Sequence, residues 1–193
     1  MAGMPTLFDT FVYRGNQTGP RLLVLGAVHG NEKCGSIAIQ RLKEQLSSGG
    51  LRIERGQLTL VPVTNRTAFE RNQRAGDRDL NRNLQPTSSP VDNEDHVANE
   101  LCPLLQQHDV LLELHSFHSP GAPFVMVGPQ DNEGSLEPFT RAAEEEALAR
   151  RLGVQRAVDG WLDTYARGAA DAVAAVSTAS ALPSTCGRTV ATA

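Results

Sequence analysis

The sequence predicts an α/β fold in which helices flank a central, mostly parallel sheet. Short apolar runs rich in branched residues alternate with longer stretches of helical periodicity. This alternation is typical of strands that are connected by helices covering the faces of one sheet. With 193 residues, the chain has the length of one domain with a short appendage.

The predicted elements follow one another in a regular order. The first strand, at 21–28, is a continuous apolar run, and the helix after it, at 32–46, ends at two serines and two glycines. The remaining elements are strand 57–63, helix 92–107, strands 109–115 and 123–127, and helix 136–152. The polar stretch 64–90 is too long for a simple connection, and loops of this length in compact domains are usually functional.

Composition and charge exclude several classes of protein. The formal net charge of −4 disfavours a nucleic-acid-binding protein. No apolar run approaches the roughly 20 residues of a membrane helix, and the first residues lack the pattern of a signal peptide. The scattered cysteines Cys34, Cys102 and Cys186 form no C-x-x-C pair, which indicates a reducing compartment. We therefore expect no nucleic-acid or membrane partner and a cytoplasmic location.

Two histidines and a glutamate lie at the ends of predicted strands. His29 and Glu32 follow the first strand directly, and His115 ends strand 109–115. Ligands of such sheets sit at the carboxyl ends of the strands, so these three side chains can converge on one cation. Two His, one Glu and a position left to water form the ligand set of a catalytic zinc site. The His-x-x-Glu pair alone is a weak signal, and His115 alone could be an ordinary histidine, but their joint placement favours a metal site.

The other histidines are weaker candidates. His118 lies close to His115 but in the loop after the strand. His96 and His108 lie in or beside a polar helix, where we expect them to face solvent. The cysteines are expected to be core or surface thiols.

The polar stretch carries a cluster of arginines. Its members are Arg71, Arg74, Arg78 and Arg82. Such a run is usually a solvated face, and Asp77 and Asp79 could pair with some of the arginines. Alternatively, guanidinium groups bind carboxylates through paired hydrogen bonds, Asn81 can add an amide donor, and an arginine could stabilise a tetrahedral oxyanion. The stretch therefore predicts either a solvated surface or a carboxylate-binding loop.

Three motifs in this chain resemble the succinylglutamate desuccinylase/aspartoacylase family. They are G-A-V-H-G-N-E at 26–32, D-L-N-R-N at 79–83 and L-E-L-H-S at 112–116, in the order of the family. The resemblance spans about residues 22–167. It implies a zinc carboxypeptidase-like layered fold with a mostly parallel central sheet.

The resemblance also implies roles for individual residues. His29, Glu32 and His115 would hold one Zn²⁺ per chain. Asn81 and Arg82 would contact a substrate carboxylate, and Arg74 matches the family's arginine that polarises the scissile carbonyl. Glu113 stands where the family commonly has Asp, which puts its support of the metal ligands in question.

The C-terminal part departs from the family pattern. Family members continue into a strand with a general-base glutamate, often before Cys-Gly, and then into a smaller β domain. Here Thr185 precedes Cys186 and Gly187, so we expect the general-base Glu and the β domain to be absent. The expected division is an incomplete catalytic domain at 1–168 and a weakly structured tail rich in Ala, Ser and Thr at 169–193.

The tail has a possible origin in a shifted reading frame. Back-translation of 175–193 with freely chosen synonymous codons, read two bases further on, allows a peptide containing I-G-T-T-E-Y-M-R-A-H-G-G-Y-G. The family has a similar sequence shortly before its catalytic glutamate. We expect a frameshift between about residues 168 and 175, and the alternative is a genuine Ala-rich tail. The nucleotide sequence decides between them.

These observations predict a zinc-dependent deacylase-type hydrolase. Its substrate would be a small N-acyl amide, or an ester, that bears a carboxylate, and its activity would be impaired by the missing glutamate. Two alternatives stay open, namely a non-catalytic zinc- or carboxylate-binding fragment and a metallocarboxypeptidase. The acyl group and the oligomeric state have no signature in the sequence.

Overall fold

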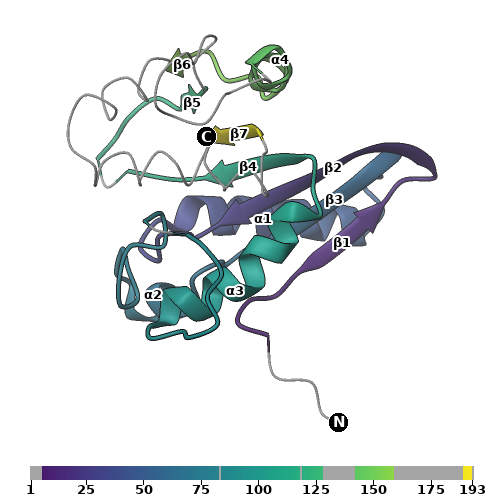
Figure 1. The fold of residues 1–193 in the computed structure, drawn as a ribbon. Coiled ribbons are helices and arrows are strands. Elements are labelled where there is room, and N and C mark those ends of the chain that lie inside the picture. The colour runs from purple at the N-terminus through teal and green to yellow at the C-terminus, as the bar shows by residue number, and fades with distance from the viewer. Residues whose placement is uncertain (1–5, 83, 118, 128–141, 159–188, 193) are drawn as a thin grey trace.

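The computed structural model describes residues 6–82, 84–117, 119–127, 142–158 and 189–192. Within these residues, strands form one sheet of order β1-β3-β2-β4-β7-β5-β6 (Figure 1). The strands are β1 Phe11–Arg14, β2 Gln17–Gly26, β3 Arg55–Val61, β4 Val110–Leu114, β5 Val125–Met126, β6 Ala157–Val158 and β7 Thr189–Thr192. The helices are α1 Lys33–Ser47, α2 Arg66–Arg71, α3 Asn93–Gln106 and α4 Ala142–Arg151.

The sheet is mostly parallel, as the sequence predicts. Strand β2 pairs in parallel with β3 on one side and with β4 on the other. Strand β4 is also parallel to β7, and β5 is parallel to β6. The antiparallel pairs are β1 with β3 and β5 with β7. The carboxyl ends of β2, β3 and β4 therefore lie along the same edge of the sheet.

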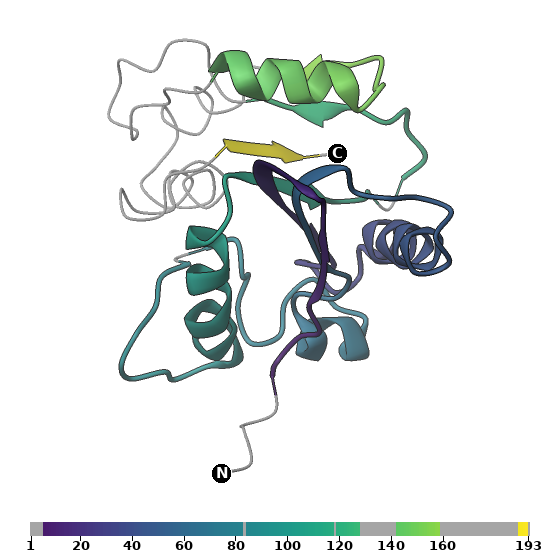
Figure 2. The same cartoon turned by 90° about the vertical axis from the view of Figure 1, so that its right-hand side faces the viewer.

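Helices cover both faces of the sheet, with α3 on one face and α1 on the other (Figure 2). Successive side chains of a strand point to opposite faces, so Leu23 and Leu25 pack in the cluster that contains Leu101 of α3. Val24 lies between them in sequence and packs in the cluster that contains Ile39 of α1. Because both faces are buried, the strand is a continuous apolar run rather than an alternating one.

Most of the predicted elements are present, with small shifts of their ends. The predicted strands 21–28, 57–63, 109–115 and 123–127 correspond to β2, β3, β4 and β5. The predicted helices 32–46 and 92–107 correspond to α1 and α3, and the last one corresponds to α4. Residues 136–141 of that last prediction lie outside the described residues.

The structure contains elements within or beside the predicted connections. Helix α2 lies in the polar stretch and has six residues, which is too short to give a recognisable period. Asn65 caps its first turn by accepting a hydrogen bond from the backbone N–H of Ala68. Asn72 ends the helix in the left-handed conformation, with φ 52°, which Asn tolerates better than most residues. Strands β1 and β6 were also not expected from the sequence.

The prediction that His108 faces solvent is wrong. Its side chain is only 2% exposed, because the chain turns from α3 onto the sheet at this point. Its Nδ1 donates to the carbonyl oxygen of Leu104 at 2.7 Å, and its Nε2 lies 2.6 Å from the hydroxyl of Thr59 on β3. The imidazole is therefore a satisfied interior group, whereas His96 is exposed on α3 as expected.

The predicted tail falls mostly outside the described residues. Residues 159–188 and 193, and with them the expected frameshift and the sequence around Thr185, are not described. Residues 189–192 form strand β7, which lies beside β4 in the sheet. The expected boundary between 168 and 169 therefore stays a prediction.

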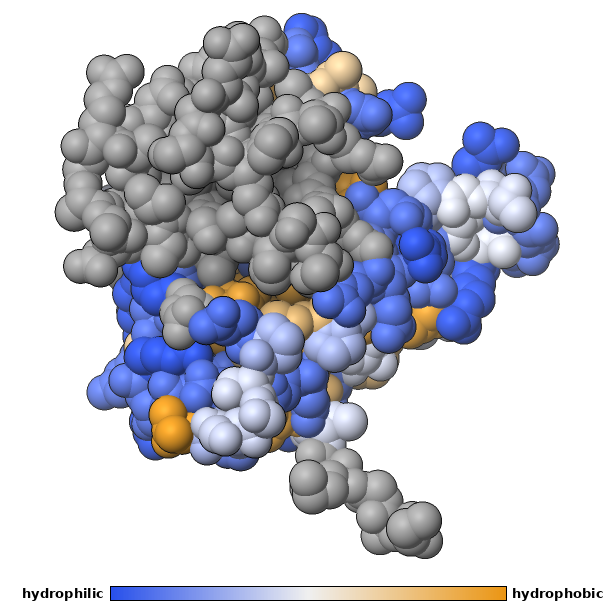
Figure 3. All heavy atoms as spheres, viewed as in Figure 1, coloured by the Kyte–Doolittle hydropathy of each residue, from blue (hydrophilic) through white to orange (hydrophobic). Residues whose placement is uncertain are grey.

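The described surface is mostly polar on the face shown in Figure 3, where its hydrophobic areas are small. Apolar side chains gather instead in two clusters, one on each side of the sheet. Within the described residues, no helix combines the length and the apolar character that crossing a membrane requires.

A close backbone contact fixes the turn after β2. A Cβ atom on Gly30 would lie 1.9 Å from the carbonyl carbon of Ala68 in α2. We predict that Gly30→Ala lowers the free energy of unfolding by about 2 kcal/mol, because the turn and α2 must separate. Chemical denaturation monitored by circular dichroism measures the change. Gly121→Ala is the matched control, since a Cβ there meets no atom within 4 Å, and equal stability of the two variants would contradict the prediction.

Candidate metal centre and its supporting loop

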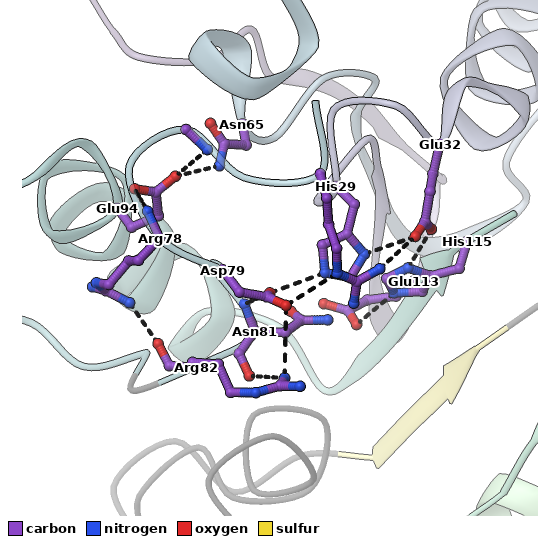
Figure 4. A network of polar contacts seen from close by, with 12 residues as sticks. His29, Glu32, Asn65, Arg78, Asp79, Asn81, Arg82, Glu94, Glu113 and His115 are labelled. Atoms are coloured by element: carbon purple, nitrogen blue, oxygen red, sulfur yellow. Dashed lines mark hydrogen bonds and ion pairs between the residues drawn. The ribbon is translucent and has the colours of Figure 1, made fainter. Parts of the chain in front are cut away.

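The pairing of β2 with β4 brings the predicted ligands together. In this register Gly26 lies opposite Leu114, so the turn after β2 and the residue after β4 meet at one edge of the sheet. The ligand atoms of His29, Glu32 and His115 all lie within 4.8 Å of one another. Figure 4 shows the three side chains converging from these two strand ends.

The turn that carries His29 is held by the segment that follows β3. The carbonyl oxygen of Gly26 accepts hydrogen bonds from both the N–H and the hydroxyl of Thr64, at 2.9 and 3.0 Å. Ala27 has a φ of 47°, a left-handed conformation that is uncommon for a residue with a Cβ. Its carbonyl oxygen accepts from the N–H of Asn65 at 3.1 Å. The strained turn directs His29 back toward β4. Strained backbone conformations of this kind are common near functional sites.

The donor atoms fit a divalent cation such as zinc. Nδ1 of His29 is buried and has no hydrogen-bond partner among the described residues, although it lies 3.0 Å from Oε1 of Glu32. Nδ1 of His115 lies 2.8 Å from Oε2 of the same carboxylate. A buried ring nitrogen without a hydrogen bond, next to a second ring nitrogen and a carboxylate, is the arrangement that a zinc ion would satisfy.

Each ring has a second carboxylate behind it. Nε2 of His29 lies 3.0 Å from Oδ1 of Asp79, and Nε2 of His115 lies 3.4 Å from Oε2 of Glu113. A carboxylate at this position fixes the tautomer and orientation of a metal-binding imidazole. Glu113 therefore contacts the imidazole of His115 despite its additional methylene, and it is itself buried.

The acidic surroundings perturb the pKa values of the ligands in the metal-free chain. Burial alone would lower the pKa of His115, but hydrogen bonds with Glu113 and Glu32 outweigh it and raise the pKa to about 10. Burial alone would raise the pKa of Glu32, but the hydrogen bond from His115 and the nearby His29 ring hold it well below its usual range. The edge of the sheet is therefore an environment that stabilises positive charge.

Arg74 lies on the open side of this group. Its Nη1 lies 3.1 Å from Oε1 of Glu32, and its Nε lies 3.2 Å from Oδ2 of Asp79. The side chain is 53% exposed, so one side of the guanidinium group faces solvent. The structure thus brings this arginine next to Glu32 and Asp79.

The other two predicted substrate residues, Asn81 and Arg82, lie beside Asp79 (Figure 4). The N–H of Asn81 donates to Oδ1 of Asp79 at 2.9 Å. The guanidinium group of Arg82 donates to the carbonyl oxygen of Asn81 at 2.9 Å and lies 3.9 Å from Oδ2 of Asp79. The side chain of Arg82 is 40% exposed, so it is available at the same edge.

The remaining two arginines have structural partners, so the arginine cluster divides into two pairs. Arg78 forms ion pairs with Asp92 and Asp95 at the start of α3, both at 2.7 Å. Arg71 donates to the carbonyl oxygen of Gly76 at 2.7 Å. The solvated-surface interpretation therefore describes Arg71 and Arg78, and carboxylate binding by Arg74 and Arg82 stays a prediction.

Sequence reasoning missed the carboxylate that holds this loop. Glu94 is completely buried, and its oxygens accept from the backbone N–H groups of Gly76, Asp77 and Arg78 at 2.9, 3.0 and 3.1 Å. In the sequence it stands among polar residues at the start of a helix, where nothing distinguishes it from an exposed glutamate. The contact of Asp79 with His29 was also not predicted from the sequence, because an aspartate near arginines is expected to pair with them.

The match to a protein family agrees with these features. The model of the succinylglutamate desuccinylase/aspartoacylase catalytic domain matches residues 18–121, a range that contains both histidines, Glu32 and the arginine loop. The chain belongs to this family.

Solved structures show the same fold. A succinylglutamate desuccinylase from Silicibacter sp. TM1040 has a TM-score of 0.67 at 22% identity, over 96% of this chain and 52% of that one. A succinylglutamate desuccinylase/aspartoacylase from Rhodobacter sphaeroides has a TM-score of 0.71 at 21% identity, over 96% and 50%. The product-bound ectoine utilization protein EutE (DoeB) from Ruegeria pomeroyi has a TM-score of 0.66 at 22% identity, over 95% and 51%.

These likenesses establish the fold and the extent of the match. The chain spans about half the length of the solved structures it resembles. A search of curated proteins gives no match.

The buried Glu94 makes stability depend on pH. Burial favours the neutral acid, but hydrogen bonds from Asn65 and from the N–H groups of Arg78 and Asp77 hold the pKa of Glu94 below its usual range. A lowered pKa stabilises the fold above the unfolded value of about 4.3, and this stabilisation is lost as the pH falls through the folded pKa. We predict that Glu94→Gln reduces the loss of stability of the metal-free chain between about pH 5 and pH 3.

Denaturant unfolding at a series of pH values measures this dependence. Glu70→Gln is the control, since Glu70 is exposed on the neighbouring helix α2 and its removal should leave the pH dependence unchanged. If the stability of Glu94→Gln falls with pH as steeply as that of the unmodified chain, the prediction is wrong.

Proposed function

We propose that this chain is a zinc-dependent hydrolase of a small N-acyl amide, or ester, that bears a carboxylate. One observation carries the proposal. His29, Glu32 and His115 converge with a buried ring nitrogen that lacks a hydrogen bond, and exposed guanidinium groups flank them. Membership in a family of desuccinylases and aspartoacylases supports the reaction type.

The residues of the site suit hydrolysis of an acyl bond. Zinc, when bound, polarises a carbonyl group and lowers the pKa of its water toward about 7. His29, Glu32 and His115 would hold one ion, while Asp79 and Glu113 keep the two rings in orientation. Arg74 can donate a hydrogen bond to the carbonyl oxygen as negative charge develops on it.

The proposed substrate class follows from Asn81 and Arg82. An amide donor and a guanidinium group at the same edge can orient a carboxylate through several charge-assisted hydrogen bonds. The substrate would therefore carry a carboxylate at one end and the scissile bond near Arg74. Cys34 is an exposed cysteine outside any disulfide, which is consistent with the cytoplasm as the proposed location.

A second candidate is a protein that binds zinc or a carboxylate without turnover. It is favoured by the sequence around Cys186, where Thr185 stands in place of the family's general-base glutamate. Loss of a general base typically slows a reaction by about 10²–10⁴-fold, so we expect slow hydrolysis.

Hydrolysis of peptides with free rather than blocked C-termini would instead indicate a carboxypeptidase.

Removal of a metal ligand separates these possibilities. We predict that the unmodified chain binds one zinc ion and slowly hydrolyses at least one member of a panel of N-acyl amino acids, and that a chelator abolishes turnover. His29→Ala and Glu32→Ala should lose stoichiometric zinc and turnover together, because each removes a ligand from a three-residue set. Metal analysis after dialysis and a product assay measure both properties.

The control for these variants is His96→Ala, since this histidine is exposed on α3 and is not part of the cluster of His29, Glu32 and His115. Stoichiometric zinc without turnover would support the non-catalytic candidate. Absence of zinc from the unmodified chain would overturn the proposal.

Arg74 should act on the rate rather than on metal binding. We predict that Arg74→Ala lowers kcat by about 10²-fold, because one donor to the developing oxyanion is lost. Zinc stoichiometry should not change. Steady-state kinetics with the best substrate of the panel measures the effect, with Arg41→Ala on the exposed side of α1 as the control. An effect on KM alone would assign Arg74 to substrate binding instead.

A further inference from the structure

We propose that Glu94 is a positioning residue of the metal centre, acting through the loop that carries Arg74 and Asp79. Its carboxylate touches none of the three proposed ligands. It binds the back of the loop whose front reaches His29 and Glu32. The inference rests on the proposed metal site and assigns a function to a buried acid that the proposed reaction does not use.

The contacts of Glu94 fix the loop backbone at three successive positions. Oε1 accepts from the N–H of Gly76, and Oε2 accepts from the N–H groups of Asp77 and Arg78. Three backbone donors on one carboxylate define the path of the loop more strictly than a side-chain contact could, because the donors cannot rotate away. Hydrogen bonds to a charged acceptor are also among the stronger ones in proteins.

Two asparagines connect Glu94 to the turn that carries His29. Nδ2 of Asn65 donates to Oε1 of Glu94 at 2.8 Å, and Nδ2 of Asn93 donates to the same oxygen at 3.1 Å. The backbone N–H of Asn65 donates in turn to the carbonyl oxygen of Ala27, two residues before His29. The same carboxylate therefore connects the arginine loop with the turn after β2.

The front of the loop meets the proposed ligands directly. Asp79 accepts from Nε2 of His29, and Arg74 donates to Glu32. The carbonyl oxygen of Arg74 also accepts from the N–H of Gly30 at 3.3 Å. A shift of the loop away from Glu94 would therefore move the carboxylate that orients His29.

Gly76 provides an independent way to disturb the same contact. A Cβ at this position would lie 2.6 Å from Oε1 of Glu94 and 2.8 Å from Nδ2 of Asn93. Gly76→Ala therefore pushes the loop off the carboxylate without removing the charge. In Glu94→Gln the shape is retained, but the new NH₂ group faces backbone N–H donors.

The affinity for Zn²⁺ tests the proposal. It is measured on the full chain by competition with a chromophoric chelator, for Glu94→Gln, Gly76→Ala, Asp79→Asn and the double variant of Glu94 and Asp79. We expect each single variant to weaken zinc binding by about tenfold or more, as partners behind metal ligands typically do. Glu70→Gln and Gly121→Ala are the controls and should bind zinc as the unmodified chain does.

The double variant identifies the route of the effect. If Glu94 acts through Asp79, the double variant binds zinc no more weakly than Asp79→Asn alone. If the two losses of zinc affinity multiply in the double variant, the proposal is overturned. Unchanged zinc affinity in folded Glu94→Gln also overturns it, because a purely structural residue lowers stability without changing zinc affinity. Circular dichroism at the titration temperature confirms folding, and Gly76→Ala decides the question if Glu94→Gln does not fold.

The outcome is separate from that of the proposed function. Weak or absent turnover with the expected pattern of zinc affinities leaves the positioning role intact. Zinc-dependent turnover with unchanged affinity in Glu94→Gln and Gly76→Ala refutes the positioning role and leaves the proposed function intact.

Discussion

The parallel pairing of β2 with β4 is the constraint on which the rest of the site depends. It places the turn after Gly26 beside the end of β4 at Leu114, and no local feature of either segment could bring the two histidines together without it. The pairing is itself secured from both faces, because alternate residues of β2 pack under α3 and under α1. The hydrophobic core thus determines the position of the polar edge.

Around that edge, negative charge is arranged in two layers. Glu32 lies between the two imidazoles, and Asp79 and Glu113 lie behind them. Arg74 and Arg82 partly balance this charge from the exposed side. Such an arrangement favours a small cation inside and an anionic group outside, and these are the two partners that a hydrolase of carboxylate-bearing substrates must hold at once.

Local patterns in the sequence predicted strands β2 to β5, the main helices and the proposed ligands, because continuous apolar runs and His-x-x-Glu are short-range signals. The burial of Glu94 and His108 was not predictable in this way. Their partners are backbone N–H groups of a distant loop in one case and Thr59 of β3 in the other, and neither leaves a signature near the residue. The division of the arginines also required the structure, since only the position of α3 determines that Arg78 is paired.

Asn65 illustrates how few substitutions the residues around this edge of the sheet can accept. Its Oδ1 accepts from the N–H of Ala68 and from the amide of Asn93, and its Nδ2 donates to Glu94. Aspartate has the same shape but would place a second carboxylate 2.8 Å from that of Glu94, whereas leucine would leave the donors and the acid without partners. Genetic variation at this codon should therefore be poorly tolerated, although the residue lies in no motif and touches no proposed ligand.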